Sequence, residues 1–462
     1  MPIYIYNSLT RKKEKFVPLS PPKVNIYTCG VTVYDDCHIG HARSLYIFDL
    51  MRRYLEYRGF KVNFVRNITD IDDKIINRAK ELKVDWKGLS EKYISRYYED
   101  LAALGISEAD CEPRATENIP EMIKYIEVLI NKGYAYVTET GVYFSVRKFN
   151  DYGKLSGQAI KEMFSGVRKE SDETKKDPLD FALWKMSKPD EPFWDSPWGK
   201  GRPGWHIECS VMSQKFLKSE TLDIHAGGRD LIFPHHENEL AQAEALTGKP
   251  FSNYWIHHGL LTINAQKMAK SLGNFITIKD FIAKYKNADL LKLFFLSAHY
   301  SHPIDYTEEK IEEAKKALER IAILIDKIEK KVSGIKYQVS SKKNTEIEEI
   351  KNKFIEAMDD DFNTPQGLAA IFDLVNAANK NIENTDFILP AKRVLSELLG
   401  IFKISLKKEE IFDTEIEAKI LERNSARANK NFALSDKIRK ELEQKGIILE
   451  DTKEGTTWRR KI

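Results

Sequence analysis

The chain has 462 residues, 42% of them hydrophobic, so it is long enough to bury a sizeable core and to form two to four domains. Lys and Arg number 73 against 70 Asp and Glu, a net charge of +3, so affinity for a polyanion would have to come from local basic patches. No stretch reaches the roughly 18 apolar residues of a membrane span. The four cysteines contain no CxxC pair and are too few for a disulfide framework, so we expect a cytoplasmic protein with reduced thiols.

The N-terminal pattern predicts a parallel strand, helix and strand. Residues 24–27 and 62–65 are predicted to be buried strands, and a helix is expected from about Ala42 to Arg58. Such units connect with a right-handed crossover, and open α/β sheets bind ligands at the carboxyl ends of their strands. The loops 29–41 and 67–73 follow those ends and are therefore the candidate site loops.

The rest of the chain predicts an interrupted α/β domain followed by helices. Residues 115–203 break the pattern with short β-like runs such as 141–144 and a charged stretch at 161–178, which indicates an insertion. The strand and helix rhythm resumes at Trp205, with a core strand at 254–258. After Pro303 apolar residues recur at helical intervals, and 331–344 is a polar linker. We expect a Rossmann-like, doubly wound parallel-sheet domain with an insertion, followed by an all-α C-terminal region.

Two short motifs can handle a nucleotide. In CHIGHAR, Gly40 stands between His38 and His41 just before a helix, where backbone NH groups and imidazoles can converge on a phosphate. In KMAKS, Lys267 and Lys270 can bring two ammonium groups to a triphosphate. The alternatives are a helix cap with a surface histidine, and an ordinary solvated loop. The position of CHIGHAR directly after the first predicted strand favours phosphate binding.

Separated cysteines and one histidine-rich segment form a candidate metal site. Cys29, Cys209 and the segment FPHHENE supply S, N and O donors, which suit Zn²⁺ better than Mg²⁺ or Ca²⁺. His235 and Glu239 are four residues apart and would share one helix face. The residues alone do not choose His235 over His236, or Glu239 over Glu237. The alternative is that the cysteines are small buried hydrophobic residues and FPHHENE is a polar helix start.

The segments YTCGVTVYDDCHIGHAR, GRPGWHIECS and DLIFPHHENE resemble the cysteinyl-tRNA synthetase family of class I aminoacyl-tRNA synthetases, over nearly the whole chain. The family pattern has Ser where this chain has Ala269. The resemblance implies catalytic roles for His38, His41, Lys267 and Lys270; ATP binding by Gly40, His41 and Lys270; zinc ligation by Cys29, Cys209, His235 and Glu239; and substrate binding by Thr69, Trp205, His225 and Asp230.

The resemblance also implies a two-step reaction. L-cysteine attacks the α-phosphate of ATP to give cysteinyl adenylate, and a terminal ribose hydroxyl of tRNA(Cys) then takes the cysteinyl group. One Zn²⁺ per chain would distinguish the substrate thiol from the hydroxyl of serine, and Mg²⁺ would accompany ATP. No segment resembles a separate hydrolytic editing domain, and a monomer is implied.

The C-terminal part is expected to contact tRNA. The stretches 359–365 (DDDFNTP) and 423–458 recur in the helical and anticodon-binding parts of the family, although a solvated helical hairpin with a packed Trp458 fits the residues alone equally well. The implied division is 1–114, first half of the catalytic domain; 115–203, connective insertion; 204–260, second half; 261–335, KMSKS-type loop and stem-contact region; 336–405, helical bundle; and 406–462, anticodon-binding domain.

Two other functions fit parts of the sequence. A related ligase that joins activated cysteine to an amino sugar would share the catalytic half, but the complete C-terminal part argues against it. A zinc-containing RNA-binding protein without catalysis would leave the histidines of CHIGHAR and the lysines of KMAKS without a role.

Overall fold

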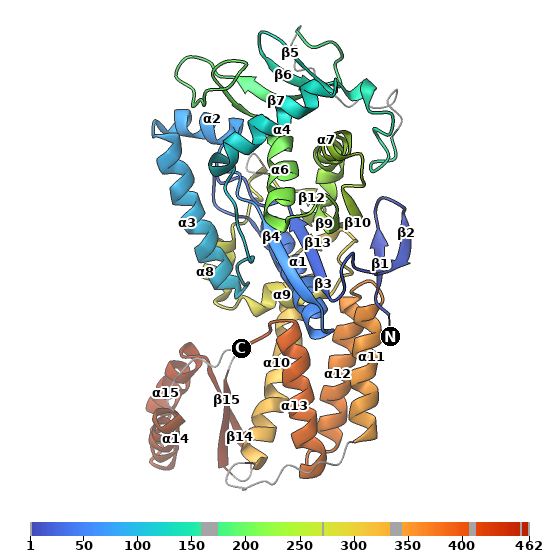
Figure 1. The fold of residues 1–462 in the computed structure, drawn as a ribbon. Coiled ribbons are helices and arrows are strands. Elements are labelled where there is room, and N and C mark those ends of the chain that lie inside the picture. Colours follow the sequence, from blue (N-terminus) through green and yellow to red (C-terminus); the bar gives the residue numbers. More distant parts are fainter. Residues whose placement is uncertain are drawn as a thin grey trace. The chain divides into compact units, whose positions relative to one another are not determined.

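The computed structural model describes residues 2–158, 174–269, 272–332, 344–405, 413–452 and 455–460. The chain divides into two compact units (Figure 1). The first comprises residues 1–286, 298–306 and 356–364, and the second comprises 287–297, 307–355 and 365–462. Much of the charged stretch at 161–178 and of the linker at 331–344 lies outside the described residues, as do Lys270 and Ser271. The six-part division of the chain stays a prediction.

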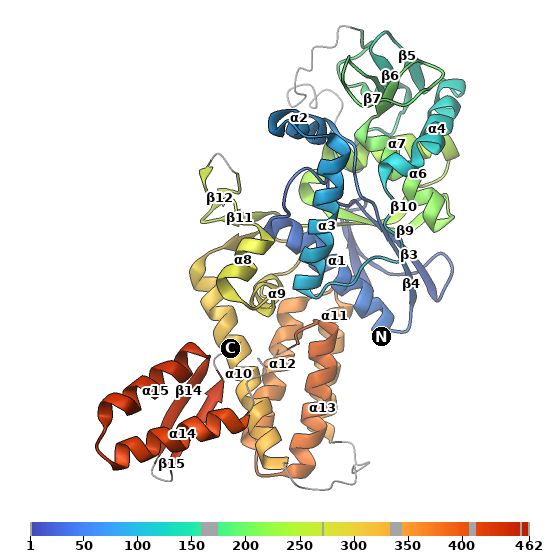
Figure 2. The same ribbon diagram turned by 90° about the vertical axis from the view of Figure 1, so that its left-hand side faces the viewer.

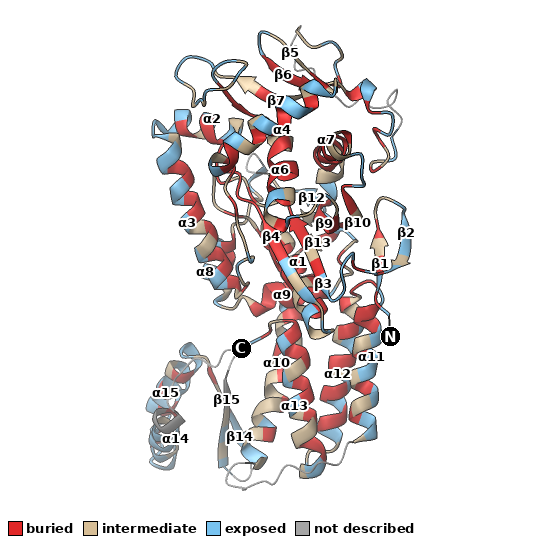
Figure 3. Ribbon diagram, in the orientation of Figure 1, coloured by how far each residue is buried: buried red, intermediate tan, exposed pale blue. Residues whose placement is uncertain are grey.

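A four-stranded parallel sheet organises the first unit. Its strands lie in the order β10-β9-β3-β4, with bounds β3 (Lys23–Thr28), β4 (Lys61–Arg66), β9 (Leu222–Gly228) and β10 (Ser252–His258). All seven residues of β9 are buried (Figure 3), as expected for a parallel sheet covered on both faces. The strands predicted at 24–27, 62–65 and 254–258 are confirmed, and so is the parallel-sheet fold class.

The helix α1 (Ile39–Tyr57) joins β3 to β4 and packs against β4 and β9. It begins three residues before the predicted start because the segment CHIGH caps it. The backbone NH of His41 donates to Nδ1 of His38 over 3.1 Å, and the NH of His38 donates to Nδ1 of His41 over 3.3 Å. This reciprocal cap satisfies two otherwise unpaired donors of the first turn. The candidate phosphate-binding histidines are therefore part of the helix start itself.

The insertion contains an antiparallel sheet whose strands lie in the order β5-β6-β7-β8 (Figure 2). The β-like runs expected there are confirmed. The bounds of the remaining elements of the first unit are β1 (Tyr4–Asn7), β2 (Lys12–Lys15), α2 (Asp73–Leu82), α3 (Trp86–Leu104), η1 (Ala115–Asn118), α4 (Ile119–Asn131), β5 (Ala135–Val137), β6 (Gly141–Phe144), η2 (Val146–Lys148), β7 (Phe181–Met186), β8 (Gly201–Pro203), α6 (Trp205–Leu217), η3 (Arg229–Leu231), η4 (Ile232–His236), α7 (Glu237–Thr247), β11 (Leu261–Ile263), β12 (Gln266–Lys267), α8 (Ile278–Tyr285) and β13 (Ile304–Tyr306).

The second unit is mainly helical, as predicted. Its helices are α9 (Asp289–Leu296), α10 (Glu308–Val332), α11 (Thr345–Asp359), α12 (Thr364–Lys380), α13 (Thr385–Ile401), α14 (Asp413–Ala428) and α15 (Phe432–Gln444), although residues 356–359 of α11 and Thr364 of α12 belong to the first unit. The chain also forms a hairpin of β14 (Ile447–Thr452) and β15 (Gly455–Arg460), which the sequence analysis did not anticipate. Trp458 packs against the small core of α14, α15 and this hairpin. None of the helices in the described part of the chain has both the length and the apolar character needed to cross a membrane.

The stretch DDDFNTP is anchored in the first unit. The carboxylate of Asp361 accepts hydrogen bonds from the NH of Tyr6 over 2.8 Å and from the hydroxyl of Tyr300 over 2.7 Å. The hydroxyl of Tyr54 donates to Asp359 over 2.7 Å. Asp359 and Asp361 are each only 4% exposed. Their hydrogen bonds therefore hold the DDDFNTP stretch in place within the first unit. A contact of this stretch with tRNA stays a prediction.

Candidate active site

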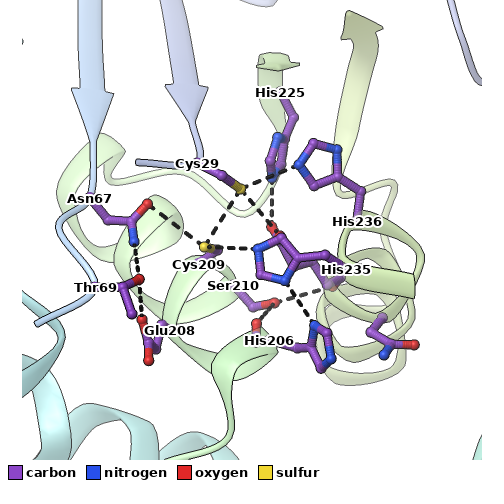
Figure 4. Close-up of polar contacts among 12 residues, drawn as sticks. Cys29, Asn67, Thr69, His206, Glu208, Cys209, Ser210, His225, His235 and His236 are labelled. Atoms are coloured by element: carbon purple, nitrogen blue, oxygen red, sulfur yellow. Dashed lines mark hydrogen bonds and ion pairs between the residues drawn. The ribbon is translucent and has the colours of Figure 1, made fainter. Parts of the chain in front are cut away.

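Side chains from several segments meet beyond the carboxyl ends of the sheet strands (Figure 4). Cys29 directly follows β3, and Asn67 and Thr69 follow β4. Cys209 comes from α6, while His235 and Glu239 come from η4 and α7. These side chains therefore meet at the edge of the sheet where the sequence predicted a ligand site, because the strands run parallel and end together.

Four of these side chains have the spacing of metal ligands. Sγ of Cys29 lies 3.6 Å from Sγ of Cys209 and 3.4 Å from Oε1 of Glu239. Nε2 of His235 lies 3.6 Å from Sγ of Cys209 and 2.8 Å from Oε1 of Glu239. Ordinary Zn–S, Zn–N and Zn–O bonds in a tetrahedral site separate the ligand atoms by about 3.3 to 3.8 Å. The two thiols, the imidazole and the carboxylate thus fit a zinc ion with small adjustments.

A second group shares two of these ligands. Cys29, His225, His236 and Glu239 also have their ligand atoms within 4.8 Å of one another. Nε2 of His236 lies 3.3 Å from Sγ of Cys29, and Nε2 of His225 lies 2.6 Å from Oε2 of Glu239. The first group holds two thiols and the second holds one, and softer donor sets favour zinc. The choice of His235 over His236 is therefore supported by the donor chemistry and stays a prediction.

Single alanine substitutions can separate the two groups. We expect His235→Ala to lower zinc affinity by more than the about 10- to 100-fold typical of changes outside the ligand set, and His236→Ala to remain within that range. Competition with a chromogenic chelator measures both affinities. A larger loss in His236→Ala than in His235→Ala would assign the metal to the second group.

Glu237 and Asn238 have another task. The carboxylate of Glu237 accepts hydrogen bonds from the NH of Gly153 over 2.9 Å and from the NH of Ser156 over 2.7 Å. The hydroxyl of Tyr152 donates to the side chain of Asn238 over 2.5 Å. These contacts tie the insertion to α7. Because both oxygens of Glu237 are engaged there, Glu239 is the carboxylate of FPHHENE that remains as a candidate metal ligand. We call the set of Cys29, Cys209, His235 and Glu239 the metal group.

Outer contacts orient the metal group. Nδ1 of His235 pairs with Nδ1 of His206 over 2.8 Å, which leaves Nε2 of His235 facing Cys209 and Glu239. Trp205 stacks on the His235 ring at 3.8 Å. His206 was not among the predicted site residues, although its position three residues before Cys209 places both on one face of α6. Burial opposes a charge on His235, but Glu239 and Cys209 together outweigh that effect and raise the pKa of His235 to about 10.

The predicted substrate-binding residues divide between buried and exposed positions. The hydroxyl of Thr69 donates to Glu208 over 2.8 Å and accepts from the side chain of Asn67 over 3.2 Å. His225 is fully buried and Trp205 is half-buried, and both contact the metal group through Glu239 and His235. Asp230 is exposed in η3. Their roles toward substrate stay predictions.

The two nucleotide motifs lie side by side. His38 bridges to Thr277, and the NH of Ile39 donates to the carbonyl of Ile276 over 3.1 Å, so the segment after KMAKS pairs with CHIGH. A Cβ added at Gly40 would lie 2.9 Å from the His38 ring and 3.3 Å from Cε of Met268. Met268 of the second motif therefore covers the glycine of the first. Lys267 is exposed at the end of β12.

The two histidines of CHIGH stack on each other, with ring centroids 3.6 Å apart. Desolvation by the surrounding atoms, reinforced by the charges of His38 and Lys74, lowers the pKa of His41 well below its usual value. His41 is therefore neutral at physiological pH. Because Nδ1 of His41 accepts from the NH of His38, the neutral ring carries its proton on Nε2 and can donate one hydrogen bond toward a nucleotide. It supplies no net charge, which leaves charge stabilisation to the lysines.

A buried carboxyl beside this loop predicts a pH-dependent stability. Burial, together with Asp36 and Glu99, raises the pKa of Asp100 to about 7, whereas an unfolded chain has about 3.9. The folded state therefore loses stability as pH rises from 4 to 7. We expect Asp100→Asn to stabilise the protein by on the order of 2 kcal/mol at pH 8 and not at pH 4, as urea unfolding measures. An equal gain at both pH values would contradict the electrostatic cause.

Comparisons with known proteins agree with this geometry. Residues 15–316 match the family described as tRNA synthetases class I (C) catalytic domain, and residues 353–407 match the DALR domain. The fold resembles a Mycobacterium tuberculosis methionyl-tRNA synthetase bound to methionyl-adenylate (TM-score 0.61, 15% identity, 83% of this chain and 88% of that one). It also resembles a LeuRS of Agrobacterium radiobacter in a complex with tRNA and LeuAMS (TM-score 0.64, 12% identity, 84% of each chain). The fold and the paired motifs thus define a class I aminoacyl-tRNA synthetase.

Closer relatives give the particular family. A cysteine–tRNA ligase of Anoxybacillus flavithermus is 51% identical and is matched over 100% of both chains. Those of a Geobacillus species and of Aquifex aeolicus are 52% and 48% identical, over 99% or more of each chain. The chain belongs to the cysteine–tRNA ligase family of enzymes, as the sequence motifs predicted.

Proposed function

We propose that this protein activates L-cysteine with ATP and then transfers the cysteinyl group to tRNA(Cys). In the first step a cysteine carboxylate oxygen bonds to the α-phosphorus while the bond from the α-phosphorus to the α,β-bridging oxygen breaks, giving cysteinyl adenylate and pyrophosphate. In the second, a terminal ribose hydroxyl of tRNA attacks the acyl carbon, loses its proton and releases AMP. The observation that carries the proposal is the two-thiol metal group lying at the same sheet edge as the paired nucleotide motifs.

Positioning and electrostatics would drive the first step. His38 and His41 stand at the start of α1, where the positive end of the helix dipole favours phosphate. Lys267 and Lys270 would place positive charge on the pyrophosphate leaving group. Ala269 removes a hydroxyl that the family pattern has, and both lysines remain. Mg²⁺ would accompany ATP.

Cysteine selection would rest on Cys29, Cys209, His235 and Glu239. Together they supply a soft, buried donor set suited to one zinc ion. When bound, zinc supplies a Lewis acid that prefers a thiolate over a hydroxyl. A pocket of shape alone could not reject serine, because a site that fits SH admits OH. Thr69, Trp205, His225 and Asp230 would hold the amino and carboxylate ends of the substrate.

The C-terminal helices and the β14–β15 hairpin would bind tRNA(Cys). The exposed Arg427 and the half-buried Trp458 are a cation and an aromatic side chain, types that bind unpaired bases, whereas Arg423 is buried and paired with Asp451. We expect the protein to act as a monomer. The need for reduced Cys29 and Cys209 favours the cytoplasm as its place of work.

Cysteine-dependent exchange of pyrophosphate into ATP tests the activation step, with serine as competitor and with zinc quantified, stripped by chelation and restored. We expect exchange that is specific for cysteine and that follows zinc occupancy. Exchange independent of zinc would keep the ligase and remove the metal from selection. No exchange at any zinc occupancy would contradict the activation step.

A further inference from the structure

Arg43 is a fully buried cation in α1, two residues after His41. Its guanidinium donates to four backbone carbonyls. Nη1 contacts the oxygens of Gly259 over 2.7 Å and Leu260 over 2.9 Å. Nη2 contacts those of Tyr300 over 3.1 Å and His302 over 2.6 Å. One side chain thus holds two chain segments that are about forty residues apart.

These carbonyls lie at the base of the hairpin that carries Lys267. Gly259 and Leu260 connect β10 to β11, and the 300–302 segment leads into β13. Strands β11 and β13 pair in parallel, starting at Leu261 and Ile304, while β11 and β12 form the hairpin. The base is tightly closed, because a Cβ at Gly259 would lie 2.2 Å from the His302 carbonyl. Any shift of this base would move Lys267 with it.

Packing alone does not explain why a cationic side chain occupies the buried position of Arg43. Among the described residues no carboxylate lies within ion-pair distance of its guanidinium. Burial lowers its pKa to about 10, so it stays cationic at neutral pH. Burying a charge without a counter-ion is costly, and an apolar side chain of similar volume commonly fills such a position without that cost. A planar fork, however, can bind several carbonyls in fixed directions, which an apolar side chain cannot.

The hairpin has a second attachment on its other side. Asn274 donates to the carbonyl of Lys267 over 3.1 Å and accepts from the NH of Ala269 over 2.8 Å. Thr277 then bridges back to His38, directly before α1. The described part of KMAKS is therefore held near the start of α1 on both sides. The segment before it is bound by Arg43 of α1, and Thr277 in the segment after it pairs with His38.

We propose that Arg43 is a positioning residue for cysteine activation, which fixes the β11–β12 hairpin against α1 and so sets where Lys267 meets a triphosphate held at His38 and His41. This rests on the proposed function. Arg43 itself touches no substrate; it acts through the hairpin. The placement of Lys267 against His38 and His41 therefore depends on Arg43, whereas zinc binding by the metal group does not.

Three variants test this in pyrophosphate exchange on the zinc-loaded full chain. Because small misplacements of catalytic groups can cost about 100-fold in rate, we expect Arg43→Met to lower kcat by at least about 10-fold and to raise KM for ATP. KM for cysteine and zinc content should stay at wild-type values. Arg43→Lys keeps the positive charge but loses the planar guanidinium group. It should fold normally and show smaller changes in kcat and in KM for ATP, again with KM for cysteine and zinc content unchanged.

Arg58→Met is the matched control. Arg58 stands at the other end of α1, where it contacts Asp359 and the Tyr54 hydroxyl, away from the hairpin. It should lose thermal stability without changing KM for ATP. Hydrogen exchange of the amides at 259–268 should be faster in Arg43→Met than in Arg58→Met.

Two results would overturn the proposal. One is a pair of Arg43 variants whose kcat and KM for ATP equal those of Arg58→Met at temperatures where all are folded. The other is an equal rise of KM for cysteine and for ATP, which would show a general loss of structure. If the wild-type protein itself gave no exchange, the proposed function would fail, while the hydrogen-exchange comparison would still report whether Arg43 fixes the hairpin.

Discussion

Replacing Cys209 by serine is expected to abolish zinc binding at neutral pH and, with it, the selection of cysteine over serine. Sγ of Cys209 lies 3.6 Å from both Sγ of Cys29 and Nε2 of His235, so it stands inside the donor set. A serine hydroxyl does not ionise at neutral pH and is a poor ligand for zinc. We expect the ratio of kcat/KM for cysteine to that for serine to fall from about 10⁴ or more to near unity.

Zinc per chain by atomic absorption and exchange with each amino acid measure this effect. The control is Cys111→Ser, which makes the same chemical change at a half-buried cysteine outside both candidate metal groups. It should keep full zinc and full selectivity. A Cys209→Ser protein that retained its zinc and its preference for cysteine would show that the proposed ligand set is wrong.

The strands of the parallel sheet were predictable where they are runs of apolar residues. β3, β4 and β10 contain such runs, and all three were located within two residues. β9 was not located, because its sequence LDIHAGG holds an aspartate, a histidine and two glycines. It is a strand because β3 and β10 pair with it on either side, so tertiary context overrides its weak local propensity.

The ligand types in the site were predictable, but their selection within FPHHENE was not. The four-residue spacing correctly predicted that His235 and Glu239 meet, because Nε2 of His235 lies 2.8 Å from Oε1 of Glu239. The spacing alone does not exclude His236 or Glu237. What settles the place of Glu237 is its pairing with the loop of Gly153 and Ser156, a contact between segments about eighty residues apart. No local pattern reports such a contact.

The juxtaposition of the nucleotide motifs was likewise beyond the sequence. The sequence indicated that each motif could bind phosphate. The two motifs lie close together, however, because the 276–278 segment pairs with residues 37–39. Backbone pairing of this kind uses only NH and carbonyl groups, so no side-chain pattern reports it. Arg43 shows the same limit, because an arginine inside a helix pattern reads as a surface residue until its four carbonyl partners are placed.

Substituting alanine for Gly40 is expected to lower kcat for pyrophosphate exchange by about 100-fold while the protein keeps its fold and its zinc. Gly40 lies in the first turn of α1, where alanine is the better helix former, so the backbone itself favours the change. The added methyl group would lie 2.9 Å from the His38 ring and 3.3 Å from Cε of Met268. The ring must therefore move, and its stacking on His41 and the cover of Met268 move with it.

Thermal unfolding, zinc analysis and exchange kinetics on one preparation separate this effect from misfolding. Gly88→Ala is the matched control, because Gly88 also lies in the first turn of a helix, α3, and its added Cβ would meet only Oδ2 of Asp85 at 3.8 Å. It should exchange like the wild type and be slightly more stable. If Gly40→Ala exchanged at the wild-type rate, activation would not depend on where His38 and Met268 lie. The metal group, at the other side of the site, should bind zinc equally in all three proteins, so a loss confined to the ATP step would show that the glycine serves the nucleotide motifs alone.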